Sequence, residues 1–283
     1  ARAASLPPDV KGQSWAPGVL EEHQLHAYLL LGQVAQARQA YRSLLERTQR
    51  PVRRLGRAAL AQARQYAQSG QVEQAIALLA PPGDFPAEAL NLLANLYSLQ
   101  NDWPNAARTM QFAIAQLGRV PPPGWWTNLA QFTLHAGQYR RHAETWCRFA
   151  LATAQNSQRA GPLNLLGIIA LGDENPARAA EFFVQAVLAD PDEHEPAARD
   201  NLIKLCRTTG VTPAELFRQQ GHRFLHQIQF ELAAQAFAAA VELAPHDAET
   251  YKLLAVALQR AGREHDAVTA WQTAQQLENV EAA

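Results

Sequence analysis

The stretch 248–277 carries apolar residues at the spacing of a helix, interrupted once. Its first run places apolar side chains three or four positions apart, at Tyr251, Leu254, Ala255 and Leu258. The pattern breaks at Gly262, and a second run continues with Ala267, Trp271 and Ala274. This spacing predicts two short amphipathic helices joined by a tight turn. The small alanines allow the two helices to approach closely, and we expect the larger Leu258 and Trp271 to fill the remaining space.

The same pattern recurs along the chain. The segment FFVQAVLADP (182–191) and the segment AFAAAVELAP (236–245) align at their prolines, which places Phe183 opposite Phe237. Seven helix pairs are predicted, starting near positions 18, 56, 87, 123, 160, 214 and 248. Repetition with the period of the 214–248 step is typical of arrays in which each helix pair buries a face against its neighbour.

The two aligned segments are separated by more than one such period, and the segment His194–Pro213 accounts for the excess. It predicts one additional helix at about 195–209, because Ala198, Leu202, Leu205 and Cys206 form a one-sided apolar stripe that ends at Gly210. Thr212, Pro213 and Glu215 then form the pattern of a capping box that restarts the repeat. We therefore expect a local break in the path of the array at this helix.

The helix pair at 248–277 resembles the tetratricopeptide repeat. Ala255 stands at the eighth place, which is small in that repeat, and Gly262 stands at the turn glycine. Ala267 and Ala274 stand at the alanine places 20 and 27, and Trp271 stands at the aromatic place 24. The resemblance implies an all-α, right-handed superhelical solenoid of about seven helix pairs with one inserted helix. It also implies a concave groove lined by the first helix of each pair.

The expected organisation is one continuous solenoid preceded by an extended arm. Residues 1–17 form the arm, 18–193 hold the first five units, 194–213 the inserted helix, and 214–283 the last two units. The last unit carries Gln275 where earlier units have an aliphatic residue, beside further polar residues at Thr269, Gln272, Thr273 and Gln276. We expect this last helix to be solvated and the array to end there. Packing inside the units is expected for Trp103, Trp146 and Trp271.

Composition narrows the possible partners. The 25 basic and 26 acidic residues nearly balance, which gives no reason to propose nucleic acid or an anionic membrane surface as partner. Two cysteines, Cys147 and Cys206, are expected to be buried free thiols. No apolar run is long enough to span a bilayer, and no signal peptide is visible. A cytoplasmic location is slightly favoured, and a periplasmic one stays open if a signal peptide was removed before Ala1.

No enzyme signature is present, since the phosphate-loop, dinucleotide-binding and nucleophile-elbow patterns are all absent. The histidine pairs His23/His26 and His222/His226 have metal-ligand spacing, but two ligands do not make a site. We therefore expect no catalytic residues, no metal and no cofactor.

The resemblance places the inner face of the groove on specific positions of the first helices. An amide row is expected in the middle of the groove, and its ends are expected to be basic. The groove residues implied in this way are Arg57, Arg64, Asn91, Asn95, Asn128, Gln131, His135, Asn164, Arg218, His222, His226, Lys252 and Arg260. An asparagine side chain both donates and accepts hydrogen bonds, so it can pair with a peptide main chain without reading its sequence.

The chain is therefore expected to be a non-catalytic scaffold or adaptor that binds a protein segment or partner helix in its groove during assembly of a larger complex. Two alternatives stay open: the substrate-binding portion of a larger modifying enzyme such as a glycosyltransferase, and an envelope-assembly protein. The pattern leaves the partner and the oligomeric state undetermined.

Overall fold

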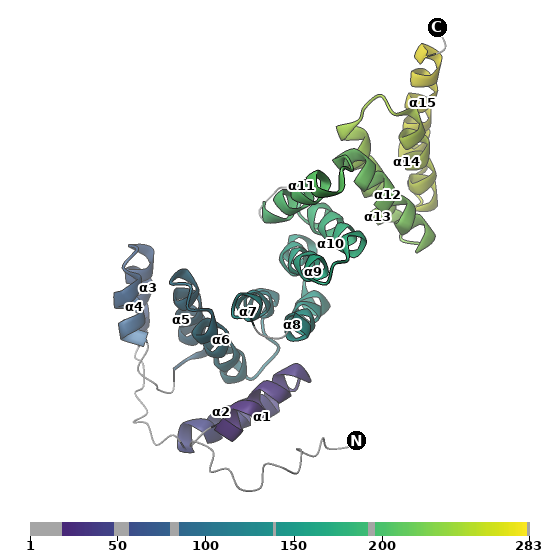
Figure 1. Ribbon diagram of the computed structural model, residues 1–283. Helices are drawn as coiled ribbons and strands as arrows, with labels where there is room; N and C mark the ends of the chain where they lie inside the picture. The colour runs from purple at the N-terminus through teal and green to yellow at the C-terminus, as the bar shows by residue number, and fades with distance from the viewer. Residues whose placement is uncertain (1–18, 48–56, 80–84, 138–139, 192–195, 282–283) are drawn as a thin grey trace, which may run out of the picture. The chain divides into compact units, whose positions relative to one another are not determined.

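The computed structural model describes residues 19–47, 57–79, 85–137, 140–191 and 196–281, and all regular structure in them is helical. The expected arm, with Trp15, lies outside these residues. Seven helix pairs follow one another along the chain (Figure 1): α1 (Val19–Leu30) with α2 (Val34–Arg47), α3 (Arg57–Gln68) with α4 (Val72–Leu79), α5 (Ala87–Leu99) with α6 (Trp103–Leu117), α7 (Pro123–His135) with α8 (Arg140–Thr153), α9 (Ala160–Gly172) with α10 (Pro176–Ala189), α12 (Pro213–His226) with α13 (Phe230–Leu243), and α14 (Ala248–Arg260) with α15 (Glu264–Glu281). The predicted all-α architecture is confirmed.

The chain divides into two compact units, with the division between Phe149 and Ala150. The second unit contains the predicted inserted helix, α11 (Ala197–Thr209), which packs against α9, α10 and α12. Gly210 ends α11 in the left-handed region at a φ of 72°, where a side chain would be strained. The Thr212 side chain accepts a hydrogen bond from the Glu215 amide at 3.2 Å, as predicted. The other half of the capping box is replaced, because the Glu215 carboxylate accepts hydrogen bonds from Arg218 and Gln219 instead.

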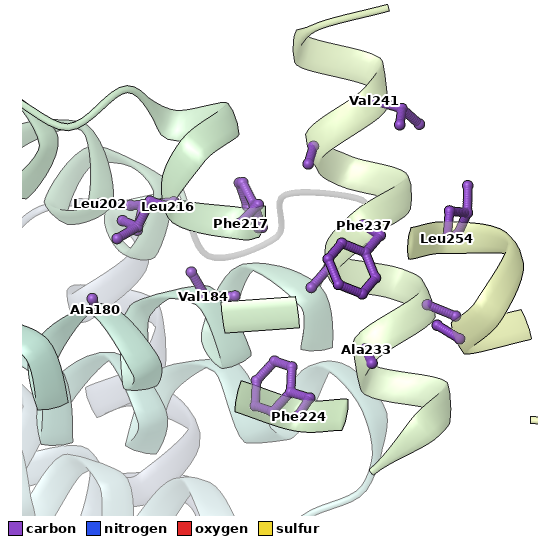
Figure 2. Packing of buried hydrophobic residues seen from close by; sticks show 14 of the residues in the cluster. Ala180, Val184, Leu202, Leu216, Phe217, Phe224, Ala233, Phe237, Val241 and Leu254 are labelled. Carbon is purple, nitrogen blue, oxygen red and sulfur yellow. The ribbon is translucent and has the colours of Figure 1, made fainter. Parts of the chain in front are cut away.

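A large apolar cluster joins the helices of the second unit. Figure 2 shows it running from Ala180 and Val184 on α10 to Leu254 on α14. Of the stripe predicted on α11, Leu202, Leu205 and Cys206 are buried in this cluster, and Ala198 is buried in a smaller one with Leu163 and Ala186. The inserted helix is therefore part of the core of its unit and not an appendage on it.

Close approach within two helix pairs explains why the segments around Phe183 and Phe237 repeat each other. A Cβ added to Gly167 would lie 2.3 Å from Cε1 of Phe183, and one added to Gly221 would lie 2.6 Å from Cε1 of Phe237. Both phenylalanine rings are fully buried. In each pair, the missing side chain on the first helix makes the space that the aromatic ring of the second helix occupies.

One buried side chain in α12 lacks a partner for its oxygen. Gln220 is 2% exposed, and its Oε1 atom makes no hydrogen bond within the described part of the chain. A buried polar atom without a partner costs roughly 1–3 kcal/mol. We expect Gln220→Met, which keeps the length of the side chain and removes the amide, to raise the free energy of unfolding by about 1 kcal/mol.

Urea denaturation followed by circular dichroism measures this change. The matched control is Gln235→Met on α13, where the side chain is exposed and no gain is expected. A loss of stability in Gln220→Met would mean that the amide is satisfied in solution.

In the first unit, the N-terminal hairpin (α1 and α2) packs on helices far from it in sequence. Helix α2 packs against α6, where the Tyr41 ring lies 5.1 Å from that of Phe112. The turn of the hairpin meets α8, since a Cβ on Gly32 would lie 3.3 Å from Cζ of Phe149. Arg108 of α6 donates to Glu22 of α1 in an exposed ion pair. The repeat pattern did not predict these contacts.

The cysteine prediction is confirmed, because Cys147 and Cys206 are both buried free thiols. Burial raises the pKa of the Cys147 thiol to about 12, with the nearby Glu144 carboxylate adding to the effect. Burial also raises the pKa of the Cys206 thiol. Both thiols therefore stay protonated and unreactive at neutral pH.

The tryptophans divide into buried and exposed ones. Trp146 is fully buried, as predicted, and Trp103 is half-buried. The prediction for Trp271 is wrong, because this side chain is 44% exposed. In the preceding pair, α14 covers the corresponding helix α13, whereas α15 packs mainly against α14. The polar residues of α15 that were expected to be solvated are exposed at Thr269, Gln272, Gln275 and Gln276.

Candidate functional site

Two neighbouring first helices, α5 and α7, bring asparagines together in the first unit. Asn95 lies one turn after Asn91 on α5, and Asn128 lies on α7. The Nδ2 atom of Asn128 donates to Oδ1 of Asn95 at 3.2 Å, although 33 residues separate them in sequence. Both side chains are half-buried. The hydrogen bond fixes the orientation of two amides that lie on different helices.

We call the surface formed by Asn91, Asn95, Asn128 and Gln131 the amide face. Gln131 is exposed, and Asn91 is half-buried. The Oδ1 atom of Asn91 is shielded and has no hydrogen-bond partner in the described residues. The amide face thus combines one fixed pair of amides with an acceptor that is not satisfied by the protein there.

An aromatic stack lies at the C-terminal end of α7. The rings of His135 on α7 and Trp103 on α6 are stacked with centroids 4.3 Å apart and an interplanar angle of 22°. His135 remains exposed, as a groove position requires. The contribution of Trp103 was not predicted, because its position in the repeat indicated only packing within its own pair.

In the second unit, Asn164 has a different environment from the other asparagines. It is only 9% exposed, and its Oδ1 accepts a hydrogen bond of 2.9 Å from Nδ2 of Asn201 on the inserted helix. The sequence did not single out Asn201, because nothing in the repeat pattern predicts which face of α11 meets α9. Asn164 is thus nearly buried against the inserted helix, whereas Asn95 and Asn128 are half-buried.

The predicted basic side chains differ in whether they already form ion pairs with acidic groups. Arg218 forms an ion pair of 2.7 Å with Glu215, and Lys252 forms one with Glu278. Exposed side chains are found at Arg64, His222, His226 and Arg260. Arg57 begins α3, and its side chain lies outside the described residues.

Metal chemistry and membrane insertion find no support in the described part of the chain. It holds no group of three or more histidine, cysteine or acidic side chains placed to bind a metal ion. None of the helices in the described ranges combines the length and apolar character that a bilayer crossing needs.

The packing of the small positions decides the type of repeat. At places 20 and 27 of the last three pairs the alanines are all buried, at Ala179, Ala186, Ala233, Ala240, Ala267 and Ala274. The eighth place faces the aromatic of place 24 closely enough to require glycine in two pairs, at Gly167 and Gly221. The helix pairs therefore pack in the manner of the tetratricopeptide repeat that their sequence resembles. Asn95 and Asn128 thus lie on the first helices of two consecutive helix pairs.

No family model matches the chain, and no curated protein matches it. Solved structures do resemble it. A tetratricopeptide repeat protein from Parabacteroides merdae is 14% identical and aligns over 85% of this chain and 98% of its own, with a TM-score of 0.46. The protein pilF of Pseudomonas aeruginosa is 17% identical and aligns over 79% of this chain and 90% of its own, with a TM-score of 0.41. YrrB, described as a tetratricopeptide protein with an unusual peptide-binding site, is 18% identical. It aligns over 68% of this chain and 87% of its own, with a TM-score of 0.34. At such identities and TM-scores, these likenesses carry no argument about ligand or activity.

Proposed function

We propose that this protein is a non-catalytic interaction scaffold that binds an extended segment of a partner protein along the amide face. The observation that carries the proposal is the hydrogen bond between Asn128 and Asn95, which holds two amides in a fixed orientation on adjacent first helices. This bond uses one N–H of Asn128 and one lone pair of the Asn95 oxygen. The Asn95 amide nitrogen and the Asn128 oxygen keep their hydrogen-bonding capacity for a ligand.

The donor and acceptor that remain suit the main chain of an extended peptide, which presents N–H and C=O groups in alternation. Asn91 lies one turn away, and the N–H groups of its half-buried amide are proposed to donate to the same segment, since its Oδ1 atom is shielded. Main-chain recognition of this kind gives affinity with little dependence on side-chain sequence. Gln131 and the stacked His135 are placed to contact side chains of the same segment.

The charge of the bound segment is proposed to be neutral or mildly acidic. Arg64 is exposed on α3, the first helix of the unit that precedes α5, and α3 packs against α5. Arg218 and Lys252 contribute less to this preference than the sequence indicated, because each is already paired with a glutamate. Asn164 is left out of the proposed ligand contacts because it is only 9% exposed and lies against Asn201 of the inserted helix.

The test uses a displayed library of unstructured peptides to select ligands for the whole chain, followed by calorimetric titration of the selected peptides. Replacing Asn91, Asn95 and Asn128 together by alanine is expected to weaken binding roughly 10- to 1,000-fold, at about 0.5–1.5 kcal/mol for each lost hydrogen bond. Circular dichroism establishes that the triple variant keeps its helices.

Asn279→Ala serves as the matched control, since Asn279 is an exposed asparagine on α15 in the other unit. Its affinity for every selected peptide should equal that of the wild type. If the folded triple variant binds the selected peptides as tightly as the wild type does, the amide face is not the binding surface.

A further inference from the structure

Two histidines join the N-terminal hairpin to α8. Nε2 of His26 on α1 lies 3.2 Å from Nδ1 of His142, although 116 residues separate them in sequence. Their ring centroids are 4.9 Å apart, and the His26 ring also meets Trp146 edge-on with centroids 5.9 Å apart. A hydrogen bond between two imidazole nitrogens requires one to donate and the other to accept. The contact is therefore lost when both rings are protonated, and two like charges then face each other.

The surroundings of the pair favour neutral rings. Burial lowers the pKa of His26, with the neighbouring His142 and His23 acting in the same direction and a hydrogen bond with the Gln111 side chain of α6 opposing them. Burial also lowers the pKa of His142. Each added proton thus weakens the contact between hairpin and core more than it would affect two histidines in water.

Two carboxylates on the packed helices are paired with arginines. On α1, Glu22 accepts hydrogen bonds from Arg108 of α6, and the neighbouring Glu21 is 4% exposed. On α8, Glu144 accepts from Arg148 at 2.8 Å. On α2, the Arg38 guanidinium lies next to Gly118, just beyond the end of α6. The carboxylates Glu22 and Glu144 are therefore each paired with an arginine, and burial rather than a carboxylate dominates the pKa of both histidines.

Other contacts of the hairpin with the core surround the histidine pair. They include the Tyr41–Phe112 contact with α6, the approach of Gly32 to Phe149 on α8 and the exposed Glu22–Arg108 pair. Exposed ion pairs contribute at most about 1 kcal/mol.

We propose that the hairpin α1–α2 is a pH-sensitive cover on α6 and α8, docked while the His26–His142 pair is neutral and released in mild acid. In the released state both rings are in water and titrate near pH 6.5, whereas in the docked state they resist protonation. The docked state then binds fewer protons, so docking is fully favourable above about pH 6.5 and weakens as the pH falls below it. Release would uncover Phe112, Trp146 and Phe149, which the hairpin contacts.

Amide hydrogen exchange read by mass spectrometry on the whole chain tests this proposal. Protection of residues 19–47 is compared with that of α5 after correction for the chemical exchange rate. The comparison is made at two pH values, about one unit above and about one unit below the ordinary histidine pKa of about 6.5. The relative protection of the hairpin is expected to fall by up to about tenfold per ring at the lower pH, because one unit below its pKa a ring in water is protonated about ten to one, and a ring that stays neutral when docked opposes docking by that factor. Unchanged relative protection would overturn the proposal.

Variants assign the effect to the two rings. The double variant His26→Gln with His142→Gln keeps hydrogen-bonding side chains that do not titrate, so its hairpin protection should not depend on pH. His265→Gln, an exposed position on α15, should behave as the wild type. If the double variant fails to dock at either pH, the single variant His142→Gln decides, because it leaves one titrating ring and should respond less than the wild type. A response equal to that of the wild type in either variant would overturn the role of the pair.

Discussion

Replacing Trp146 by alanine is expected to lower the free energy of unfolding of the first unit by about 3–5 kcal/mol. The side chain is fully buried, and its ring stacks on Trp126 with centroids 5.6 Å apart at an interplanar angle of 14°. It also contacts His26 and Phe149. Removing it would leave a large cavity where α7, α8 and the N-terminal hairpin meet, and the stacked ring of Trp126 could fill only part of that space.

The same substitution at Trp271 provides the matched control. That side chain is 44% exposed, so Trp271→Ala should cost less than about 1 kcal/mol. Urea denaturation followed by circular dichroism measures both variants. The free energy of unfolding of Trp146→Phe should lie between those of the wild type and Trp146→Ala. This variant keeps an aromatic ring and removes an indole N–H that has no partner in the described residues. Equal losses for the two alanine variants would contradict the burial difference on which the prediction rests.

Adding one methyl group at Gly221 or Gly167 is expected to lower the free energy of unfolding of the second unit. The new Cβ would lie 2.6 Å from the ring of Phe237 in one case and 2.3 Å from that of Phe183 in the other, which is far inside van der Waals contact. Overpacking of a dense core costs roughly 1–3 kcal/mol, and the gain in helix propensity returns about 0.5–1 kcal/mol. The buried rings are held by neighbouring helices and have little room to move, so we expect a loss towards the upper end of that range.

Two further variants separate the steric effect from the general effect of glycine. Gly124→Ala on α7 adds a methyl group where nothing lies within 4 Å, so it should be neutral or stabilising. Gly221→Ala combined with Phe237→Leu should recover part of the loss, because the smaller side chain makes space for the methyl group. Thermal unfolding of these proteins beside the wild type gives the comparison. If Gly221→Ala is as stable as the wild type, the close approach of the two helices does not hold in solution.

Local interactions explain why much of the fold could be predicted from the sequence. The helical period, the turn at Gly262 and the stripe on α11 involve residues close together in sequence, so their pattern predicted seven helix pairs and one inserted helix. The pairing of Gly221 with Phe237 was also accessible, because two helices joined by a short turn meet at a fixed register. Helix pairs of this kind need only local sequence information to be recognised.

The amide face could be predicted from the sequence only in part. Asn91, Asn95, Asn128 and Gln131 could be placed on first helices from their positions in the repeat, but the hydrogen bond between Asn95 and Asn128 depends on how two pairs pack. The environment of Asn164 depends on which face of α11 meets α9, and the apolar stripe of α11 leaves the position of the Asn201 side chain undetermined. Whether a polar side chain is available to a ligand is therefore a tertiary property.

The sequence by itself determined the helix pairs, the position of the inserted helix and the small residues that allow close packing. Only the tertiary structure decided that the N-terminal hairpin packs on α6 and α8, that His26 meets His142 and that Trp271 is exposed. The physical reason is that helix formation and turns depend on close neighbours in the chain. The choice of which apolar faces are buried together depends on every other face available in the folded chain.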